Sequence, residues 1–459
     1  MPSSAPDALA AVGDTLFFTA KDGIHGPELW KSDGTEAGTV LVKNINPNDS
    51  DRRPGSSPRN LTVVEGWLYF TARDGTRGRE LWKSDGTRAG TVLVKNINPT
   101  GSASSHPSSL TAMGGRLFFS ADDGTHGREL WRSNGSPAGT VLVKNIAPKG
   151  AYYSSSDPSY LTVMGRRLFF SAEDGTHGRE LWKSDGSRAG TVLVKDIDPV
   201  DDVPHYPGSD PISLTAMGGR LFFSAADGTR GEELWKSDGS RAGTTLVRDI
   251  NPGGANSDSY PSSLTAMGGR LFFSARDGTR GEELWGSDGS RAGTVLVKNI
   301  NLNRSGAAGS DPSYLTAMRD RLFFSAYDGT SGAGLWKSDG SRAGTVLVTN
   351  IDLYNYDYGY SDVLTPVGGR LFFAADDATH GVELWRSNGS TAGTVLVKDI
   401  DPCDDSGYAE SSYPSSLTAM GGQLFFAADD GTHGEELWKS DGTTEGTVLV
   451  KDIKTGTTG

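Results

Sequence analysis

Aspartate and histidine side chains recur at one spacing along the chain and could bind a metal ion. Each aspartate opens a glycine-containing loop, and in five of the loops a histidine follows three residues later. Oxygen-rich loops are typical of calcium sites. Aspartate before glycine is also what a tight turn favours, because its carboxylate caps backbone N–H groups. The aspartates are Asp22, Asp74, Asp123, Asp174, Asp227, Asp277, Asp328, Asp377 and Asp430, and the histidines are His25, His126, His177, His380 and His433.

Turn chemistry is the favoured interpretation of these loops, and calcium is the alternative. The EF-hand spacing is absent, and nine identical metal sites would be unusual. Acceptor residues that end the repeats, such as Asn44 and Asp196, would lie at the same edge. The histidines belong to separate repeats, so we expect exposed turn residues and no shared metal centre. No cofactor other than calcium is expected.

Tyrosine gathers in the variable segments that connect the repeats. Of 14 tyrosines, 12 lie in these connections, mixed with serine, glycine, aspartate and asparagine. This composition is typical of adaptable binding surfaces, whereas a purely structural tyrosine would cover gaps between repeats. Both interpretations stay open for Tyr206, Tyr260 and Tyr314. The predicted ligand-binding residues are Tyr152, Tyr153, Tyr354, Tyr356, Tyr358, Tyr360, Tyr408 and Tyr413.

Several function classes are disfavoured by the rest of the chain. The net charge of −13 argues against binding to nucleic acid, which requires clustered cations. No apolar run is long enough to cross a bilayer, and the first residues do not resemble a signal peptide. The single cysteine, Cys403, is read as an incidental free thiol. Motifs of zinc proteases, serine hydrolases and phosphate-binding loops are missing, so no enzyme is expected, although paired carboxylates for sugar cleavage stay possible.

The elements that position these residues repeat nine times. Nine tryptophans lie 49 to 53 residues apart, each within a phrase like Glu28-Leu29-Trp30-Lys31-Ser32-Asp33-Gly34-Thr35. A fixed period of this length indicates a repeat architecture. The tryptophans are Trp30, Trp82, Trp131, Trp182, Trp235, Trp285, Trp336, Trp385 and Trp438.

Each repeat predicts four short strands and no helix. In the third repeat they cover 110–113, 117–121, 129–133 and 141–144. The second is a continuous apolar run, which predicts burial on both faces, and the third alternates polar and apolar residues. Asn134-Gly135 between the last two strands favours a hairpin. All 17 phenylalanines fall in second strands, so Phe and Trp are predicted core residues.

Four antiparallel strands in every repeat predict an all-β fold, a single β-propeller of nine four-stranded blades over residues 1–459. The first strand of repeat one (9–12) and the last strand of repeat nine (448–451) are both present. Each blade is therefore expected from one contiguous repeat, with closure by packing of blades one and nine and without strand exchange. The predicted blades are 6–47, 58–99, 107–148, 158–199, 211–252, 261–302, 312–353, 362–402 and 414–454.

The phrase Glu-Leu-Trp-x-Ser-Asp-Gly-Thr/Ser, followed by Ala-Gly-Thr, resembles the bacterial ELWxxDGT repeat proteins, and the match covers the whole chain. It departs at Gly334, which replaces glutamate, at Asn134 and Asn388, which replace aspartate, and at Glu445, which replaces alanine. The Phe-Phe strand with Glu-Leu-Trp is more distantly similar to TolB-type propeller blades. The resemblance implies a propeller and an exported bacterial protein, and no defined activity.

These observations predict a non-catalytic, lectin-like propeller that binds a glycan or another surface molecule through tyrosine-rich loops. Its expected location is extracellular or at the bacterial cell surface, with a role in adhesion. A protein–protein scaffold in a larger assembly is the alternative, and a polysaccharide-active enzyme is the third. The expected partners are a glycan or a surface protein, with no nucleic acid and no transmembrane segment.

Overall fold

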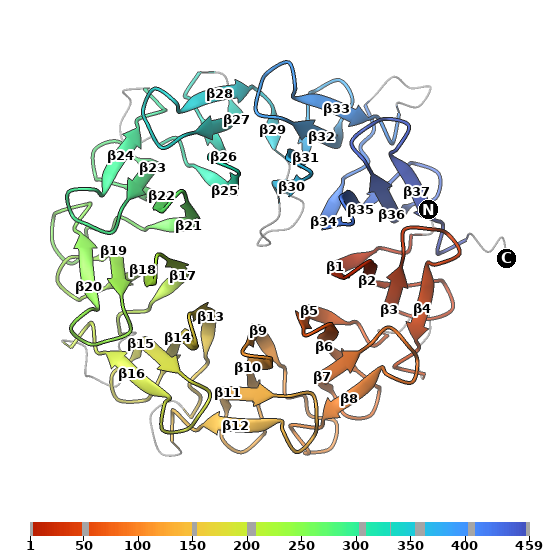
Figure 1. The fold of residues 1–459 in the computed structure, drawn as a ribbon, viewed down its shortest axis with the longest axis horizontal. Coiled ribbons are helices and arrows are strands. Elements are labelled where there is room, and N and C mark those ends of the chain that lie inside the picture. The colour runs from red at the N-terminus through yellow and green to blue at the C-terminus, as the bar shows by residue number, and fades with distance from the viewer. Residues whose placement is uncertain are drawn as a thin grey trace. The chain divides into compact units, whose positions relative to one another are not determined.

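The computed structural model describes residues 3–47, 55–148, 154–199, 208–302, 309–330, 332–353, 363–402 and 409–455. All of its regular elements are β-strands, which form nine antiparallel sheets, and we call these blades 1 to 9 in chain order (Figure 1). The prediction of an all-β fold with nine propeller blades is confirmed. Within the described part of the chain, no helix is long and apolar enough to cross a membrane.

Blades 1 to 7 and blade 9 each have four strands that follow one another in space as they do in sequence. The first strands are β1 (Asp7–Val12), β5 (Arg59–Val64), β9 (Ser108–Met113), β13 (Ser159–Met164), β17 (Ile212–Met217), β21 (Ser262–Met267), β25 (Ser313–Met318) and β34 (Ser415–Met420). The second strands are β2 (Thr15–Ala20), β6 (Trp67–Arg73), β10 (Arg116–Asp122), β14 (Arg167–Glu173), β18 (Arg220–Ala226), β22 (Arg270–Arg276), β26 (Arg321–Tyr327) and β35 (Gln423–Asp429). The third strands are β3 (Glu28–Ser32), β7 (Arg79–Ser84), β11 (Arg128–Ser133), β15 (Arg179–Ser184), β19 (Glu232–Ser237), β23 (Glu282–Ser287), β27 (Ala333–Ser338) and β36 (Glu435–Ser440). The fourth strands are β4 (Val40–Lys43), β8 (Val92–Lys95), β12 (Val141–Lys144), β16 (Val192–Lys195), β20 (Thr245–Arg248), β24 (Val295–Lys298), β28 (Val346–Thr349) and β37 (Val448–Lys451).

Blade 8 departs from this pattern at its first strand. Two short segments, β29 (Asp352–Leu353) and β30 (Thr365–Val367), both pair with β31 (Arg370–Asp376), which is followed by β32 (Val382–Ser387) and β33 (Val395–Lys398). The chain between the two segments includes the predicted cluster Tyr354, Tyr356, Tyr358 and Tyr360, which lies outside the described residues. Blade 8 therefore builds its first strand from two pieces of chain, which its repeat sequence did not predict.

The blades group into two compact units. Unit 1 contains Met1–Ser104 and Val348–Gly459, and unit 2 contains Ser105–Leu347. Unit 1 thus holds blades 1, 2, 8 and 9, and unit 2 holds blades 3 to 7. The predicted single domain over 1–459 stays a prediction.

Apolar side chains pack between successive blades within each unit. Phe118 of blade 3 shares a core with Leu168, Phe170 and Trp182 of blade 4. The second strand of blade 4 is buried on both faces, as its continuous apolar run predicted, because Phe170 packs against blade 3 and Phe169 against blade 5. Burial of each large side chain contributes roughly 2 to 3 kcal/mol, so these cores hold neighbouring blades together.

Blades 9 and 1 meet inside unit 1 without exchanging a strand. β1 pairs with β2 of its own blade, as predicted from the repeat phase. The apolar contact joins Phe18 and Trp30 of blade 1 to Phe425 and Leu437 of blade 9. Lys451 adds a polar contact, since its Nζ donates to the carbonyl of Thr39 at 3.0 Å. Side-chain packing therefore closes this junction.

Candidate functional site

Most of the predicted tyrosine site cannot be placed. Tyr152, Tyr153, Tyr354, Tyr356, Tyr358, Tyr360 and Tyr408 lie outside the described residues, as does Cys403. Tyr413 is described and is 42% exposed, and Tyr260 is exposed to the same degree, at 43%. These two tyrosines occupy equivalent positions in blades 9 and 6, each between a buried serine and a buried proline.

The carboxylate of each described loop aspartate hydrogen-bonds to groups of its own loop. Asp123 Oδ1 accepts from the backbone N–H groups of Thr125 and His126, both at 2.9 Å, and its Oδ2 lies 2.8 Å from His126 Nδ1. In blade 5 Arg230 replaces the histidine and pairs with Asp227 at 2.5 Å. Because arginine and histidine fill the same position, the common property is a side-chain nitrogen that contacts the aspartate carboxylate. These loops have the turn chemistry that the sequence favoured, and calcium stays a prediction.

The described residues contain no group of three or more histidine, cysteine, aspartate or glutamate side chains that could hold a metal ion. In blade 8 burial acts to raise the pKa of Asp377, but hydrogen bonds from His380 and Thr379 outweigh it and lower that pKa to about 2. The same hydrogen bond raises the pKa of His380. The pair is therefore held in its ionised form.

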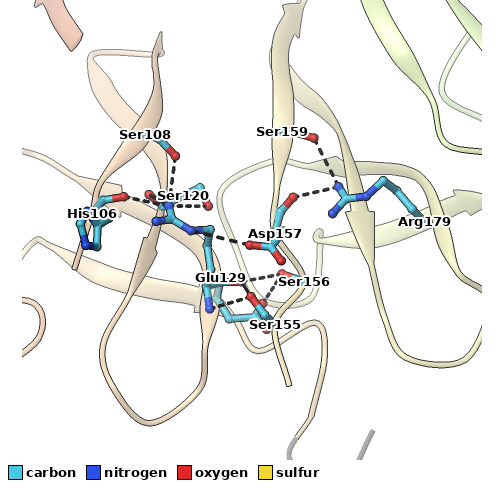
Figure 2. A network of polar contacts seen from close by, with 10 residues as sticks. His106, Ser108, Ser120, Glu129, Ser155, Ser156, Asp157, Ser159 and Arg179 are labelled. Carbon is cyan, nitrogen blue, oxygen red and sulfur yellow. Dashed lines mark hydrogen bonds and ion pairs between the residues drawn. The ribbon is translucent and has the colours of Figure 1, made fainter. Parts of the chain in front are cut away.

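The glutamate of the repeated phrase is buried, although it begins an alternating strand. Glu129 is fully buried and accepts hydrogen bonds from the backbone N–H groups of Ile146 at 2.9 Å and Ala147 at 3.2 Å. Ser156, in the crossover to the next blade, donates its hydroxyl to Glu129 Oε2 at 2.6 Å (Figure 2). We call this pair a Glu–Ser latch. The latches in the described residues are Glu28–Ser56, Glu129–Ser156, Glu180–Ser209, Glu233–Ser259, Glu283–Ser310, Glu383–Ser412 and Glu436–Ser4.

Burial changes the protonation of the latch carboxyls. It raises the pKa of Glu129 to about 7, although the hydrogen bonds from Ser156, Ile146 and Ala147 act in the opposite direction. The same cause raises the pKa of Glu180 and Glu436 to about 7. A perturbed carboxyl in a cleft could serve in catalysis, but these groups are enclosed by backbone donors and contact no solvent. Their role is to fasten one blade to the next.

The latch serine is the first member of a Ser-x-Pro triplet that leads into the first strand of eight blades. In these triplets the serine and proline are buried, and in six of them the middle residue is exposed. Every middle residue has a φ between 41° and 48°, the left-handed region. We call these positions the Ser-x-Pro rim. They are Ala5, Ser57, His106, Asp157, Asp210, Tyr260, Asp311 and Tyr413.

The backbone of this rim is strained for most side chains. Left-handed backbone costs a non-glycine residue roughly 1–2 kcal/mol, and glycine adopts it freely. Aspartate and histidine tolerate it better than alanine or tyrosine, so Ala5, Tyr260 and Tyr413 bear the larger cost. None of the eight positions is glycine. A strained residue that carries a variable, exposed side chain is typical of a functional position.

Arginine side chains fix the rim in blades 2 to 4. Arg128 Nη1 donates to the carbonyl of His106 at 2.8 Å, and its Nε lies 3.6 Å from Asp157 Oδ1 in the next blade. Arg179 donates in the same way to the carbonyl of Asp157 at 2.9 Å (Figure 2), and its Nε lies 3.7 Å from Asp210 Oδ1. Asp157 and Asp210 remain about half exposed, so both carboxylates can still meet a ligand.

The rim becomes acidic in blades 5 and 6. Glu232 replaces the arginine and bonds Ser224 Oγ at 2.8 Å. Burial raises the pKa of Glu232, and the nearby charges of Asp258 and Asp210 raise it further, while Ser224 lowers it. Glu282 makes the same contact with Ser274 at 2.6 Å. This part of the rim therefore carries several carboxylates close to one another.

The Ser-x-Pro rim was missed from the sequence, although a signal is present there. Eight serines stand two residues before a proline, each at the entry to a repeat, and no other proline follows this pattern. A residue before proline is biased away from the right-handed helical region, which marks the position as special. The latch partner, by contrast, lies 27 residues from Glu129 and could not be paired with it by spacing.

No protein-family model and no curated protein matches the chain, so the ELWxxDGT resemblance stays a prediction. Solved structures with similar folds include a puromycin hydrolase, 15% identical, with a TM-score of 0.43 over 93% of this chain and 59% of that one. A prolyl endopeptidase is 13% identical, with a TM-score of 0.41 over 83% of this chain and 52% of that one. The propeller domain of the trilobed protease from Pyrococcus furiosus is 9% identical, with a TM-score of 0.35 over 76% of this chain and 99% of that one.

The predicted function is corrected at this point. A non-catalytic propeller that binds glycans or surface ligands through tyrosine-rich loops was expected, and the similar solved structures are peptidases. This chain spans about three fifths of the length of the puromycin hydrolases. At TM-scores below 0.5 the likeness assigns no activity to this chain.

Proposed function

We propose that the Ser-x-Pro rim of unit 2 selects peptide substrates that carry basic side chains. The observation that supports the proposal is the exposed side chain kept on left-handed backbone at each of the five triplets of unit 2. Glycine would remove the strain, so the side chains themselves are what these positions supply. Their identity changes from blade to blade while the buried serine and proline around them stay the same.

The charge of the rim favours a cationic ligand. Its members in unit 2 are His106, Asp157, Asp210, Tyr260 and Asp311, four of them exposed acidic or aromatic groups. Glu232, Glu282 and Asp258 add carboxylates beside them. The net charge of −13 attracts cations over a longer range and repels acidic polymers.

A peptide suits this rim better than a small cation because the acidic groups belong to successive blades. Several basic side chains of one peptide can each contact a different rim residue. Because these contacts are linked through the peptide, together they bind more tightly than any one of them alone. Tyrosine adds contact area at low entropic cost. The peptide substrate would thus be chosen by the number and spacing of its basic residues.

The test uses fluorescein-labelled octapeptides that alternate glycine with arginine or, as a neutral control, with glutamine. The variant Asp157→Gly/Asp210→Gly/Tyr260→Gly/Asp311→Gly removes four rim side chains without new backbone strain. The natural chain should bind the arginine peptide at least tenfold more tightly than the glutamine peptide, and the variant should lose that preference while keeping its unfolding midpoint. A matched control, Ala5→Gly/Ser57→Gly, alters the same backbone position in unit 1 and should bind normally.

Two results would overturn the proposal. One is equal binding of both peptides by the natural chain at low ionic strength, where charge contacts are strongest. The other is an arginine preference that survives the fourfold substitution.

A further inference from the structure

Three arginine side chains gather on one face of blade 2. Arg73, the last residue of β6, lies directly opposite Arg79 of β7. Arg59 of β5 lies opposite Thr71, which stands two residues before Arg73 on β6. Residues paired across antiparallel strands, and residues two apart on one strand, point to the same face of a sheet. All three guanidinium groups therefore belong to one face, in a chain whose net charge is −13.

Arg79 is fixed in place by the backbone of its own blade. Its Nη1 donates to the carbonyl of Ser57 at 2.8 Å and to the carbonyl of Thr71 at 3.0 Å. Burial lowers the pKa of Arg79 to about 10, and the charges of Arg73 and Arg59 act in the same direction. Like charges placed directly opposite each other on neighbouring strands destabilise a sheet. Blade 2 therefore keeps a fixed positive charge beside two arginines that it repels.

Blades 3 and 4 show which groups accompany an arginine at this position of the third strand. Arg128 lies opposite Asp122, and Arg179 lies opposite Glu173. Burial raises the pKa of Glu173, and the charge of Arg179 is among the influences that oppose this shift. In both blades a carboxylate thus stands at the position that Arg73 takes in blade 2.

The same two blades supply a serine hydroxyl as a further acceptor for the arginine. Arg179 Nη1 donates to Ser159 Oγ at 3.3 Å (Figure 2), and blade 3 repeats the contact at 3.1 Å. Ser159 begins β13 in the register in which Arg59 begins β5. Blade 2 therefore has an arginine in the place of each acceptor, Arg73 for the carboxylate and Arg59 for the hydroxyl.

Arg59 and Arg73 are the exposed members of this cluster, and within the described part of the chain neither of them forms an ion pair. The carboxylate of the adjoining loop, Asp74, is already paired with Arg77 at 2.5 Å. A carboxylate brought by a ligand would restore the pairing of opposite charges that blades 3 and 4 obtain from their own strands.

We propose that blade 2 binds a carboxylate group of a ligand between Arg59 and Arg73, with Arg79 as a fixed positive charge beside it. A guanidinium presents a planar fork of donors that matches the two oxygens of a carboxylate. Carboxylate is the favoured class because it accompanies the same arginine in blades 3 and 4. The site lies within unit 1 and takes a ligand of the opposite charge, so it goes beyond the function proposed for unit 2.

The experiment measures binding of N-acetyl-glutamate amide to the full chain by ligand-observed NMR, with N-acetyl-glutaminamide as the neutral isostere. At low ionic strength the carboxylate should bind roughly fivefold more tightly, as expected for charge-assisted contacts at an exposed site. Arg73→Glu gives blade 2 the acid of blade 4, and Arg59→Ser gives it the serine of blades 3 and 4. Each variant should lose most of the preference for the carboxylate.

A matched control makes the same change of charge at the other end of the blade. Arg88→Glu, in the hairpin after β7, should bind N-acetyl-glutamate amide as the natural chain does. Arg73→Glu should also raise the unfolding midpoint, because it replaces a repulsive pair with an attractive one. Circular dichroism establishes that all the variants are folded.

Two further ligands define the class of anion. N-acetylglycine carries its carboxylate at the end of the chain, so tighter binding of this compound would assign the C-terminus of a peptide, and weaker binding an acidic side chain. Either order supports the site. Methanesulfonate is a tetrahedral anion of the same charge, and tighter binding of methanesulfonate than of both carboxylates would overturn the assignment.

The inference is also overturned if N-acetyl-glutamate amide and N-acetyl-glutaminamide bind equally to the natural chain. A preference that survives Arg73→Glu, or one that Arg88→Glu removes to the same degree, would overturn it as well, because the carboxylate would then respond to net charge or to another part of the surface.

Discussion

The two ends of each blade use polar residues in opposite ways. At the hairpin between the third and fourth strands, Asp33 Oδ1 accepts from both the N–H and the hydroxyl of Thr35, and Ser32 Oγ lies 2.7 Å from Thr39 Oγ1. At the crossover end, the latch serine and the proline of the Ser-x-Pro triplet are buried, and the residue between them is exposed in six blades. The polar groups of the hairpin hydrogen-bond to one another, whereas the crossover end exposes a side chain to solvent.

The difference separates residues that repeat from residues that vary. Hairpin residues such as Ser32, Gly34 and Thr39 recur because each one completes a turn: Gly34, for example, has a φ of 87° and donates to Ser32 Oγ at 2.9 Å. The rim residue changes from alanine to aspartate to tyrosine on the same strained backbone. Constancy along this chain therefore marks structure, and variation at a strained position is the feature that supports the proposed ligand surface.

The largest expected effect concerns pH, because several latches act together. The pKa of each of these carboxyls is about 7 in the folded chain, above the ordinary glutamate value of 4.5. Between these values the unfolded chain has lost the proton and the folded chain has kept it, so stability must fall as pH rises. We expect a loss of up to about 1.4 kcal/mol per pH unit for each such latch. The groups are Glu129, Glu180, Glu233, Glu283, Glu383 and Glu436.

Urea unfolding at pH 5, 6, 7 and 8 measures this slope, with Glu129→Gln as the control that removes one titrating group and should flatten the curve. His380 and His433, whose pKa values are raised by their aspartate partners, act in the same direction. A free energy of unfolding that stays level or increases over this range would contradict the latch assignment.

The next largest effect comes from a core position that repeats in every blade. Trp235 is 5% exposed and packs with Phe169 of the preceding blade and Phe223 of its own. Trp235→Ala should lower the free energy of unfolding by about 3 to 5 kcal/mol, because it removes the ring and leaves a cavity. Binding of the arginine octapeptide below the unfolding midpoint should not change. A normal midpoint together with lost binding would place the tryptophan in a ligand site.

A smaller effect is expected from one latch. Glu129→Ala leaves the N–H groups of Ile146 and Ala147 and the hydroxyl of Ser156 without their buried acceptor, at a cost of about 1–3 kcal/mol. Ser156→Ala removes one donor and should cost about 1 kcal/mol. If the two residues act as a pair, the double variant should cost clearly less than the sum of the single changes. Additive losses, measured by urea unfolding, would show that they act independently.

The sequence predicted the blade well because the blade is local. The Phe-Phe runs, the nine tryptophans and the Asn-Gly or Asp-Gly turns each depend on neighbours within one repeat. The sequence also predicted that blade 1 begins with its own first strand, and β1 does pair with β2 of the same repeat. The irregular entry to blade 8 followed from no local pattern, since β29 and β30 are separate pieces of chain that both pair with β31.

The proposed Ser-x-Pro rim could not be read from single repeats for a physical reason. The tyrosine pattern included Tyr413 and left Tyr260 open, but it did not show that a buried serine and proline flank each of them. Glu129 looked like the polar member of an alternating strand, and only contact with Ser156 of the next blade explains its burial. Interactions between repeats determine both features, and a repeat read alone does not contain them.

Two adjacent residues allow the most direct test of the distinction between structure and ligand binding. Ser259 donates its hydroxyl to Glu233 Oε2 at 2.7 Å, and Tyr260 beside it is strained and exposed. Ser259→Ala should lower the free energy of unfolding by about 1 kcal/mol and leave arginine-peptide binding intact. Tyr260→Gly should weaken that binding several-fold while stability stays within about 1 kcal/mol of the natural chain, because glycine relieves the backbone. The opposite pattern, with Tyr260→Gly clearly less stable and still binding normally, would contradict the account.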